Sequence, residues 1–185
     1  FGSVTKAYIE KPKLTDNQIS TIETLCLYVL SQDTQGNLNY ASPTLKDNLR
    51  TYLSEYRMIG DSIEIKDGYI INFGVDFEII VSPNHNNSEV LINCINDITD
   101  YFNIQNLQFN QPILIKDIFI LLDKIKGVQT VKNVIISNKV GGNYSNFAYD
   151  IDAATQNQVI YPSLDPSVFE LRYPNEDIKG RVVPL

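Results

Sequence analysis

The sequence lacks the features that mark several functional classes. It contains no Trp, one His and two Cys among 185 residues, and its 22 Asp and Glu outnumber its 15 Lys and Arg, for a net charge of −7. No run of Lys or Arg is longer than two residues, so the basic patch typical of proteins that bind nucleic acid or an anionic membrane is missing. The apolar runs are far shorter than the ~20 residues that cross a bilayer. An enzyme, a small-ligand binder and a part of a larger assembly remain as classes.

Side chains that carry out chemistry are also scarce. The single histidine, His85, lies in an Asn-rich loop, and no Ser or Cys nucleophile stands in a recognisable motif with it. Asp150 and Asp152 lack a third ligand at metal-binding spacing, which is typical of turn or cap residues. Gly141 and Gly142 are not followed by the Lys and Ser or Thr of a phosphate-binding loop and indicate a turn. The sequence therefore predicts no catalytic residue, no metal site and no cofactor.

The two cysteines, Cys26 and Cys94, lie far apart inside apolar runs. Such positions favour buried free thiols over a disulfide, and free thiols are typical of a reducing compartment. The chain begins with Phe1-Gly2-Ser3 and shows neither an initiator Met nor a signal-peptide pattern. We therefore expect it to be a piece of a longer polypeptide.

The longest regular pattern is an alternation over residues 69–81. Every odd position, Phe73 and Phe77 among them, is large and apolar, which predicts a long β-strand with one buried face. Asp76 and Glu78 stand on the polar face of this strand, which we interpret as its solvent side or as an interface. Shorter strands are predicted at 3–10, 25–31, 38–40, 63–65 and 128–137.

Three helices are predicted from apolar residues spaced three and four positions apart. The first, 42–58, begins with the N-cap Ser42 and with Pro43 at the first helical position. The others cover 88–102 and 113–126. Together with the strands they predict an α+β fold, a small mixed sheet covered by about three helices. The apolar stripe of the first helix consists of Leu45, Leu49, Tyr52, Leu53 and Tyr56.

The segment 139–185 has a different character. It has no helical period, yet it carries many aromatic and β-branched side chains, and short strands are predicted at 168–173 and 179–183. A solvated linker would not carry so much apolar surface, so we expect this segment to be buried on its own domain, on a second chain or on both. Its candidate interface residues are Tyr149, Tyr161, Leu164, Phe169 and Tyr173.

These patterns divide the chain into three parts. The first is a β-rich N-terminal segment, 1–41, which continues from a missing upstream region. The second is an α+β domain, 42–138, and the third is an extended, aromatic-rich C-terminal arm, 139–185.

The order of elements in the second part resembles a known family. The first helix ends in Tyr52-Leu53 and Tyr56-Arg57 and leads into the long strand that contains 71–81. Two helices follow, and then a strand that begins Gly127-Val128 and continues with Val131. This order is similar to the C-terminal part of baseplate J-like proteins.

The tail resembles a more specific group of proteins. Residues 149–183, YDIDAATQNQVIYPSLDPSVFELRYPNEDIKGRVV, are similar to the C-terminus of the baseplate wedge protein of T-even-like contractile-tailed bacteriophages, the large subunit of the inner baseplate ring. The two resemblances together cover essentially all 185 residues. The chain is far shorter than a full-length wedge protein, so the contacts of the missing N-terminal portion are not represented.

The resemblance implies a structural virion protein and not an enzyme, made late in infection in the host cytoplasm and located in the tail baseplate. It implies contacts with its own copies, as a dimer or in a ring, and with other wedge proteins, but not with nucleic acid or membrane. It also implies a part in the rearrangement that triggers sheath contraction. The family offers no catalytic or cofactor-binding residue to carry over.

Two other functions stay open. One is a ferredoxin-like regulatory module that binds a small ligand between sheet and helices, and the other is a hydrolase with an unrecognised site. A cavity of roughly a few hundred Å³ lined by convergent polar groups would favour either of them. A flat, aromatic surface formed with 139–185 would favour assembly.

Overall fold

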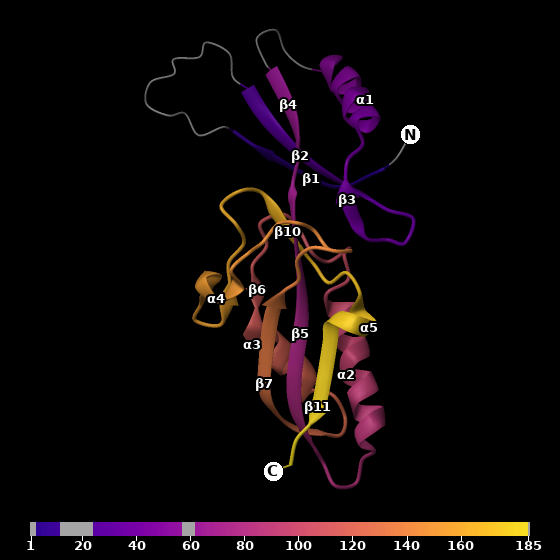
Figure 1. Ribbon diagram of the computed structural model, residues 1–185, viewed down its shortest axis with the longest axis vertical. Helices are drawn as coiled ribbons and strands as arrows, with labels where there is room; N and C mark the ends of the chain where they lie inside the picture. Colours follow the sequence, from indigo (N-terminus) through magenta and orange to yellow (C-terminus); the bar gives the residue numbers. More distant parts are fainter. Residues whose placement is uncertain (1–2, 12–23, 57–61, 185) are drawn as a thin grey trace. The chain divides into compact units, whose positions relative to one another are not determined.

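The computed structural model describes residues 3–11, 24–56 and 62–184 (Figure 1). The chain divides into two compact units, Phe1–Tyr69 and Ile70–Leu185. The expected α+β class is confirmed, since helices and open mixed sheets are both present. The boundary between the units falls inside 42–138, which the sequence patterns suggested to be one domain. The reason is that the first helix and the strand after it pack with the N-terminal strands, whereas the long strand over 69–81 organises the rest.

The first unit is built around the central strand β2 (Thr24–Gln32). β1 (Val4–Glu10) pairs with one edge of β2 in antiparallel orientation. The other edge of β2 is shared end to end by two strands, of which β3 (Leu38–Tyr40) is antiparallel and β4 (Ser62–Asp67) is parallel. Strands β1, β3 and β4 therefore all pair with β2, and β4 does so from more than thirty residues later in the chain.

Short polar side chains fix the local turns of this unit. After β2, the Asp33 carboxylate accepts a hydrogen bond from the amide of Asn37 (2.9 Å) and closes the hairpin to β3. The Ser42 hydroxyl accepts a hydrogen bond from the amide of Leu45 (3.2 Å) at the start of α1 (Pro43–Ser54), so the predicted N-cap is confirmed.

Helix α1 buries a narrower stripe than its sequence suggests. Leu45 is buried, and Leu49 and Leu53 are partly buried, against a cluster of apolar residues on β2 and β4. Tyr52 and Tyr56 are exposed, with their ring centroids 5.1 Å apart. The three leucines are spaced four residues apart, so they lie in one row along the helix and pack against the sheet, whereas the two tyrosines point away from this row.

The second unit is built around β5 (Tyr69–Val81), whose bounds are those that the alternation predicts. β7 (Val128–Asn138) pairs with one edge of β5 in antiparallel orientation, and β11 (Ile178–Val182) pairs with the other in parallel orientation. β10 (Ser167–Glu170) also pairs with β5. The longest strand is thus the centre of a mixed sheet.

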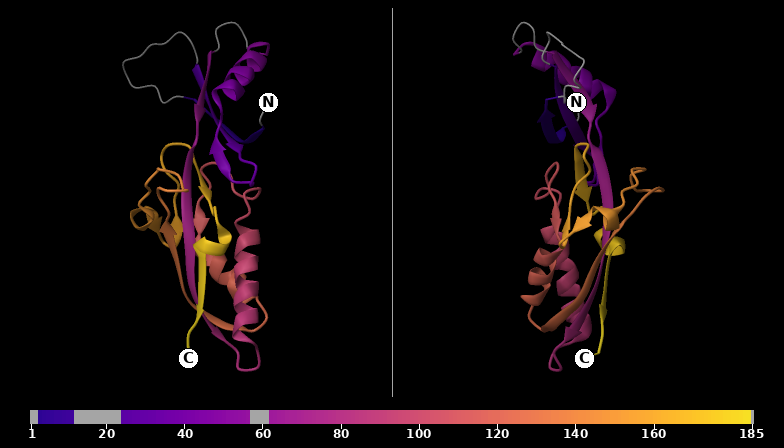
Figure 2. Two further views of the ribbon diagram at one scale, coloured as in Figure 1. Left: turned by 45° about the vertical axis from the view of Figure 1, so that its right-hand side comes forward. Right: turned by 90° about the vertical axis from the view of Figure 1, so that its left-hand side faces the viewer.

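Two helices cover one face of this sheet. α2 (Asn87–Tyr101) packs against β11 and α3 (Ile115–Asp123) against β7, and both lie on the same side of the strands (Figures 1 and 2). The odd positions of β5 face them. Phe73 is fully buried, and its ring packs edge-on against Phe102, with 4.9 Å between centroids, and against Phe169, with 6.2 Å. The predicted buried face of the long strand is confirmed.

The segment 139–185 folds within the second unit, where an extended arm was expected. β11 completes the parallel edge of β5. Strand β9 (Val159–Ile160) pairs with β6 (Ile113–Leu114), the two-residue strand that precedes α3. Asn157 and Gln158 join β8 to β9 with φ of 53° and 64°, as a tight two-residue hairpin turn requires. The strands predicted at 168–173 and 179–183 correspond to β10 and β11, whereas the other elements of the segment are too short for a period to show in the sequence. Those not yet bounded are α4 (Ile151–Ala154), β8 (Thr155–Gln156) and α5 (Pro174–Asp177).

Both cysteines are free and buried, as expected. Burial raises the pKa of the Cys94 thiol to about 12. In the part of the chain that the structure describes, no helix is long and apolar enough to cross a membrane.

Candidate functional site

Among the described residues of the second unit, no element covers the C-terminal half of β5 on the sheet face opposite α2 and α3. The even positions Asp76 and Glu78 point to this side and are half-buried. The strand register puts Ile135 of β7 and Lys179 of β11 on either side of Asp76. In the same way, Asn133 and Arg181 flank Glu78. These side chains surround a depression of about 300 Å³. We call the six residues the open sheet face: Asp76, Glu78, Asn133, Ile135, Lys179 and Arg181.

Charges on the open sheet face are sorted by strand. The two acids stand on β5 and the two bases on β11, the two β7 residues of this set are uncharged, and the exposed Lys132 follows at the bulge of β7. The Arg181 guanidinium donates to the Glu78 carboxylate, with 2.8 Å between Nε and Oε1. The side chain of Arg181 nevertheless stays 72% exposed, and Ile135 is 53% exposed. Since an ion pair so open to water stabilises a fold little, these residues are available for contact with another molecule.

A second depression adjoins the C-terminal end of β5. It has a volume of about 790 Å³ and is open to solvent. Its polar lining consists of uncharged side chains such as Ser82, Asn87 and Gln129, and it contains no ionisable group. The lining therefore contains no acid or base that could activate the Ser82 hydroxyl as a nucleophile. The whole lining is Ile80, Val81, Ser82, Pro83, Asn87, Gln129, Val182, Val183 and Pro184.

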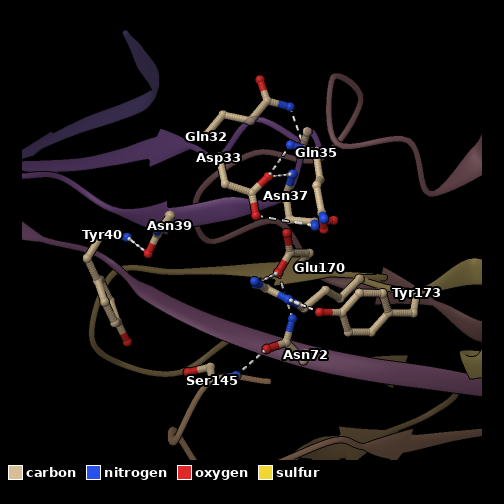
Figure 3. Close-up of polar contacts among 12 residues, drawn as sticks. Gln32, Asp33, Gln35, Asn37, Asn39, Tyr40, Asn72, Ser145, Glu170 and Tyr173 are labelled. Carbon is tan, nitrogen blue, oxygen red and sulfur yellow. Dashed lines mark hydrogen bonds and ion pairs between the residues drawn. The ribbon is translucent and has the colours of Figure 1, made fainter. Parts of the chain in front are cut away.

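Toward the N-terminal end of β5 the same sheet face is covered by the loop 139–149, which a buried amide holds in place. Asn72 is fully buried, its side-chain nitrogen donates to Glu170 Oε2 (2.7 Å), and its side-chain oxygen accepts from the amide of Ser145 (2.7 Å) (Figure 3). The backbone oxygen of Asn72 accepts from the side chain of Asn138 (2.8 Å). Arg172 lies 3.4 Å from the same oxygen of Glu170. We call these five residues the Asn72 network.

A second polar contact fastens this loop to the C-terminal segment. The Tyr144 hydroxyl donates to Asp177 Oδ1 (2.6 Å), and the Tyr173 amide donates to Asp177 Oδ2 (2.9 Å). Burial, together with the hydrogen bond to Asp177, raises the pKa of Tyr144 well above its usual range. A side chain at Gly74 would lie 2.9 Å from the carbonyl oxygen of Asp177, so the close approach requires glycine there. The arrangement joins three segments and directs no reactive group toward a cavity.

The five residues predicted to form an interface fall into two groups. Phe169 is 2% exposed, and the partly buried Tyr149 and Tyr173 pack among other rings in the second unit, Tyr149 against Phe169 itself (6.2 Å). Tyr161 and Leu164 lie on the loop between β9 and β10 and are 50% and 95% exposed. Only these last two present their side chains to solvent as an interface requires.

The remaining residues considered for chemistry have structural positions. His85 lies in the exposed loop before α2, next to Gly127, where an added Cβ would lie 3.0 Å from the imidazole ring. Asp150 accepts a hydrogen bond from the amide of Ala153 (3.0 Å) as the N-cap of α4, so the predicted cap role is confirmed. Among residues 3–11, 24–56 and 62–184, no group of three or more His, Cys, Asp and Glu could hold a metal ion.

Sequence reasoning found only part of the open sheet face. It placed Asp76 and Glu78 on the polar side of the long strand. Lys179 and Arg181 stand two residues apart in a predicted strand, which indicates that they share a face. Nothing in the sequence placed that strand beside residues 69–81, about a hundred positions earlier, because parallel pairing leaves no local signal.

Comparisons with known proteins give structural likenesses but no match of sequence. No protein-family model matches the sequence, and no curated protein matches it. The structure is similar to a chain of the anti-feeding prophage (AFP) baseplate, determined by cryo-EM and 6-fold symmetrised, with a TM-score of 0.52 and 12% sequence identity. The match covers 88% of this chain and 33% of that chain, so the present chain spans about a third of its length. At this identity the two chains share a fold.

Proposed function

We propose that this chain is a structural component of the baseplate of a contractile, phage-like tail. The observation that carries the proposal is the fold shared with a chain of the AFP baseplate over 88% of the present chain. The resemblance of residues 149–183 to a baseplate wedge protein supports the same conclusion from the sequence. Two comparisons that rest on different properties, backbone geometry and side-chain pattern, lead to one class of assembly.

The positions of the polar side chains support a structural role and not an enzymatic one. Three carboxylates are used in turns, caps and buried hydrogen bonds: Asp33 closes a hairpin, Asp150 caps a helix and Asp177 holds Tyr144. Asp76 and Glu78 lie instead on the open sheet face, where Glu78 pairs with Arg181. The larger depression carries no ionisable side chain, which also weighs against a regulatory module that binds a charged small ligand.

We further propose that the protein is a wedge subunit of the inner baseplate ring, of the kind found in T-even-like phages. It contacts its own copies and other wedge proteins, and these contacts change when the sheath contracts. The sixfold symmetry of the AFP baseplate structure makes a ring the natural setting for such a part. The surfaces that support contact are the open sheet face and the exposed loop with Tyr161 and Leu164.

The test is whether the protein is an integral part of tail particles. The gene that encodes the chain is given an affinity tag and expressed in cells that make its tail particle, and intact particles are purified under conditions that remove loosely bound protein. We expect the tagged protein in the baseplate in a fixed number of copies that is a multiple of six. Particles that assemble and contract normally when the gene is deleted would refute the proposal.

The finer proposal needs a comparison of two states. Chemical cross-linking of extended and contracted particles, read by mass spectrometry, should give cross-links from this chain to a second copy and to other baseplate proteins. Some of these cross-links should differ between the states. An identical set in both states would mean that the chain is a static part of the ring.

A further inference from the structure

The six residues of the open sheet face carry no net charge on a strongly acidic chain, and the exposed Lys132 stands beside them at the bulge of β7. The carboxylates of Asp76 and Glu78 are matched in number by the cations of Lys179 and Arg181, whereas the chain as a whole carries −7. The excess negative charge therefore lies elsewhere on the protein. Two copies repel each other through their net charge, and the open sheet face is a surface that adds no excess of like charge to that repulsion.

The charges on this face are also arranged so that it complements itself. Acids stand on β5 and bases on the adjacent parallel strand β11, at the same heights: Asp76 is the register partner of Lys179, and Glu78 that of Arg181. When two such faces meet with β5 of each copy over β11 of the other, every acid lies opposite a base.

We propose that the open sheet face pairs with the same face of a second copy of this chain, about a two-fold axis that runs parallel to the strands between β5 and β11. This inference rests on the proposed function for the kind of occupant, a like subunit. Neighbouring strands are about 4.8 Å apart, so this axis lays β5 of each copy over β11 of the other. Each acid then faces a base of the second copy, twice over by symmetry.

Other face-to-face arrangements lose this complementarity. A two-fold axis perpendicular to the strands would lay β5 over β5 and bring Asp76 and Glu78 against the same carboxylates of the second copy. An axis between β5 and β7 would put the acids over the uncharged Asn133 and Ile135. In the proposed arrangement, Ile135 of each copy lies alongside the aliphatic part of Lys179 of the other, which covers an isoleucine that is otherwise 53% exposed.

The size of the face sets the expected strength. Three short strand segments bury less than the roughly 800 Å² per partner of a standard interface, so the isolated dimer should form with Kd on the order of 10–100 μM. In a baseplate, where other contacts hold the copies close, such an affinity is sufficient.

Charge exchange between two variants of the full chain tests the proposal. The acidic-face variant is Lys179→Glu with Arg181→Glu, and the basic-face variant is Asp76→Lys with Glu78→Lys. Sedimentation velocity at low salt should show a dimer of the parent that weakens as salt is raised. Each variant alone should associate at least about tenfold more weakly, and an equimolar mixture of the two should recover a one-to-one dimer.

Two controls separate the proposal from general effects of charge and folding. Lys124→Glu with Lys126→Glu makes the same change in net charge as the acidic-face variant, at exposed positions beyond α3, and should dimerise nearly as the parent does. Far-UV circular dichroism verifies folding, and the milder pair Asp76→Asn with Glu78→Gln replaces the basic-face variant if that one fails to fold, with weaker self-association expected.

The outcomes that overturn the proposal are specific. A parent that stays monomeric at concentrations on the order of 0.5 mM would exclude the interface. A dimer that the acidic-face variant keeps, or a mixture that does not recover association, would place the contact on another surface. These measurements use the purified chain alone, so their result is independent of the particle experiment. The dimer can be absent although the protein is found in tail particles, and it can form although the protein is not found in them.

Discussion

Replacing Asn72 by alanine should destabilise the second unit more than any other single polar substitution considered. Asn72 is fully buried, and its side chain makes two hydrogen bonds of 2.7 Å, one to the buried Glu170 carboxylate and one from the amide of Ser145. The loss of a hydrogen bond to a charged group costs about 1.5–3 kcal/mol, and the loss of a neutral one costs about 0.5–1.5 kcal/mol. Arg172 remains near Glu170, so the carboxylate keeps a cation beside it. We expect a total loss of about 2–4 kcal/mol.

The assay is urea unfolding followed by far-UV circular dichroism, with hydrogen exchange of peptides from β5 as a readout specific to the second unit. Asn133→Ala on β7 is the matched control, since it removes the same side chain from an exposed position of the same sheet. Asn72→Leu keeps a similar volume and separates lost hydrogen bonds from an empty space, so it should be as destabilised as Asn72→Ala. A loss no larger than that of the control would refute the idea that the Asn72 network holds loop 139–149 on the sheet.

Three further predictions follow from the packing of the second unit. Phe73→Asp puts an unpaired charge among the rings of Phe102 and Phe169, so the second unit should not fold; a soluble, cooperatively melting variant would mean that the faces of β5 are reversed. Ending the chain after Ser145 removes β10 and β11 from β5 and should abolish cooperative melting of the second unit, whereas a truncated chain that melts normally but self-associates less would favour a separate arm. Tyr144→Phe should cost about 1–2 kcal/mol at neutral pH through the lost bond to Asp177. Because the folded pKa of Tyr144 is raised above the usual 10.0, its contribution is full below that pH and is lost as pH rises beyond it, so the stability of Tyr144→Phe should fall less steeply in alkali; parallel curves for variant and parent would show that Tyr144 ionises freely in the fold.

Periodicity was sufficient to predict an element wherever one of its faces is buried along most of its length. The bounds of β5 and the buried face with Phe73 and Phe77 are those that the alternation predicts, and α2 differs from its prediction by one residue at each end. The third helix is shorter than predicted, because Ile113 and Leu114 pair with β9 as strand β6 before α3 begins. A two-residue strand leaves no pattern of its own, and its partner lies more than forty residues later.

The predicted interface residues also show that a local sequence pattern does not identify the partner of a side chain. An aromatic side chain in an irregular segment has the same sequence signature whether it packs on its own domain or on another chain. Phe169 and Leu164 both looked available for contact, yet Phe169 packs against Phe73 and Leu164 is almost wholly in solvent. Whether such a side chain is buried or exposed depends on whether its segment pairs with a sheet. The segment of Phe169 does so, because β10 pairs with β5.

By itself, the sequence determined the α+β class, the central strand with its buried face, the free buried cysteines and the scarcity of catalytic groups, because composition and short periods carry that information. The tertiary structure decided where residues 139–185 lie and which charges share a surface. Lys179 and Arg181 reach Asp76 and Glu78 only through the parallel pairing of β11 with β5. That pairing depends on the shape and hydrogen-bonding groups of a strand formed about a hundred residues earlier, and no local pattern in either segment specifies the other.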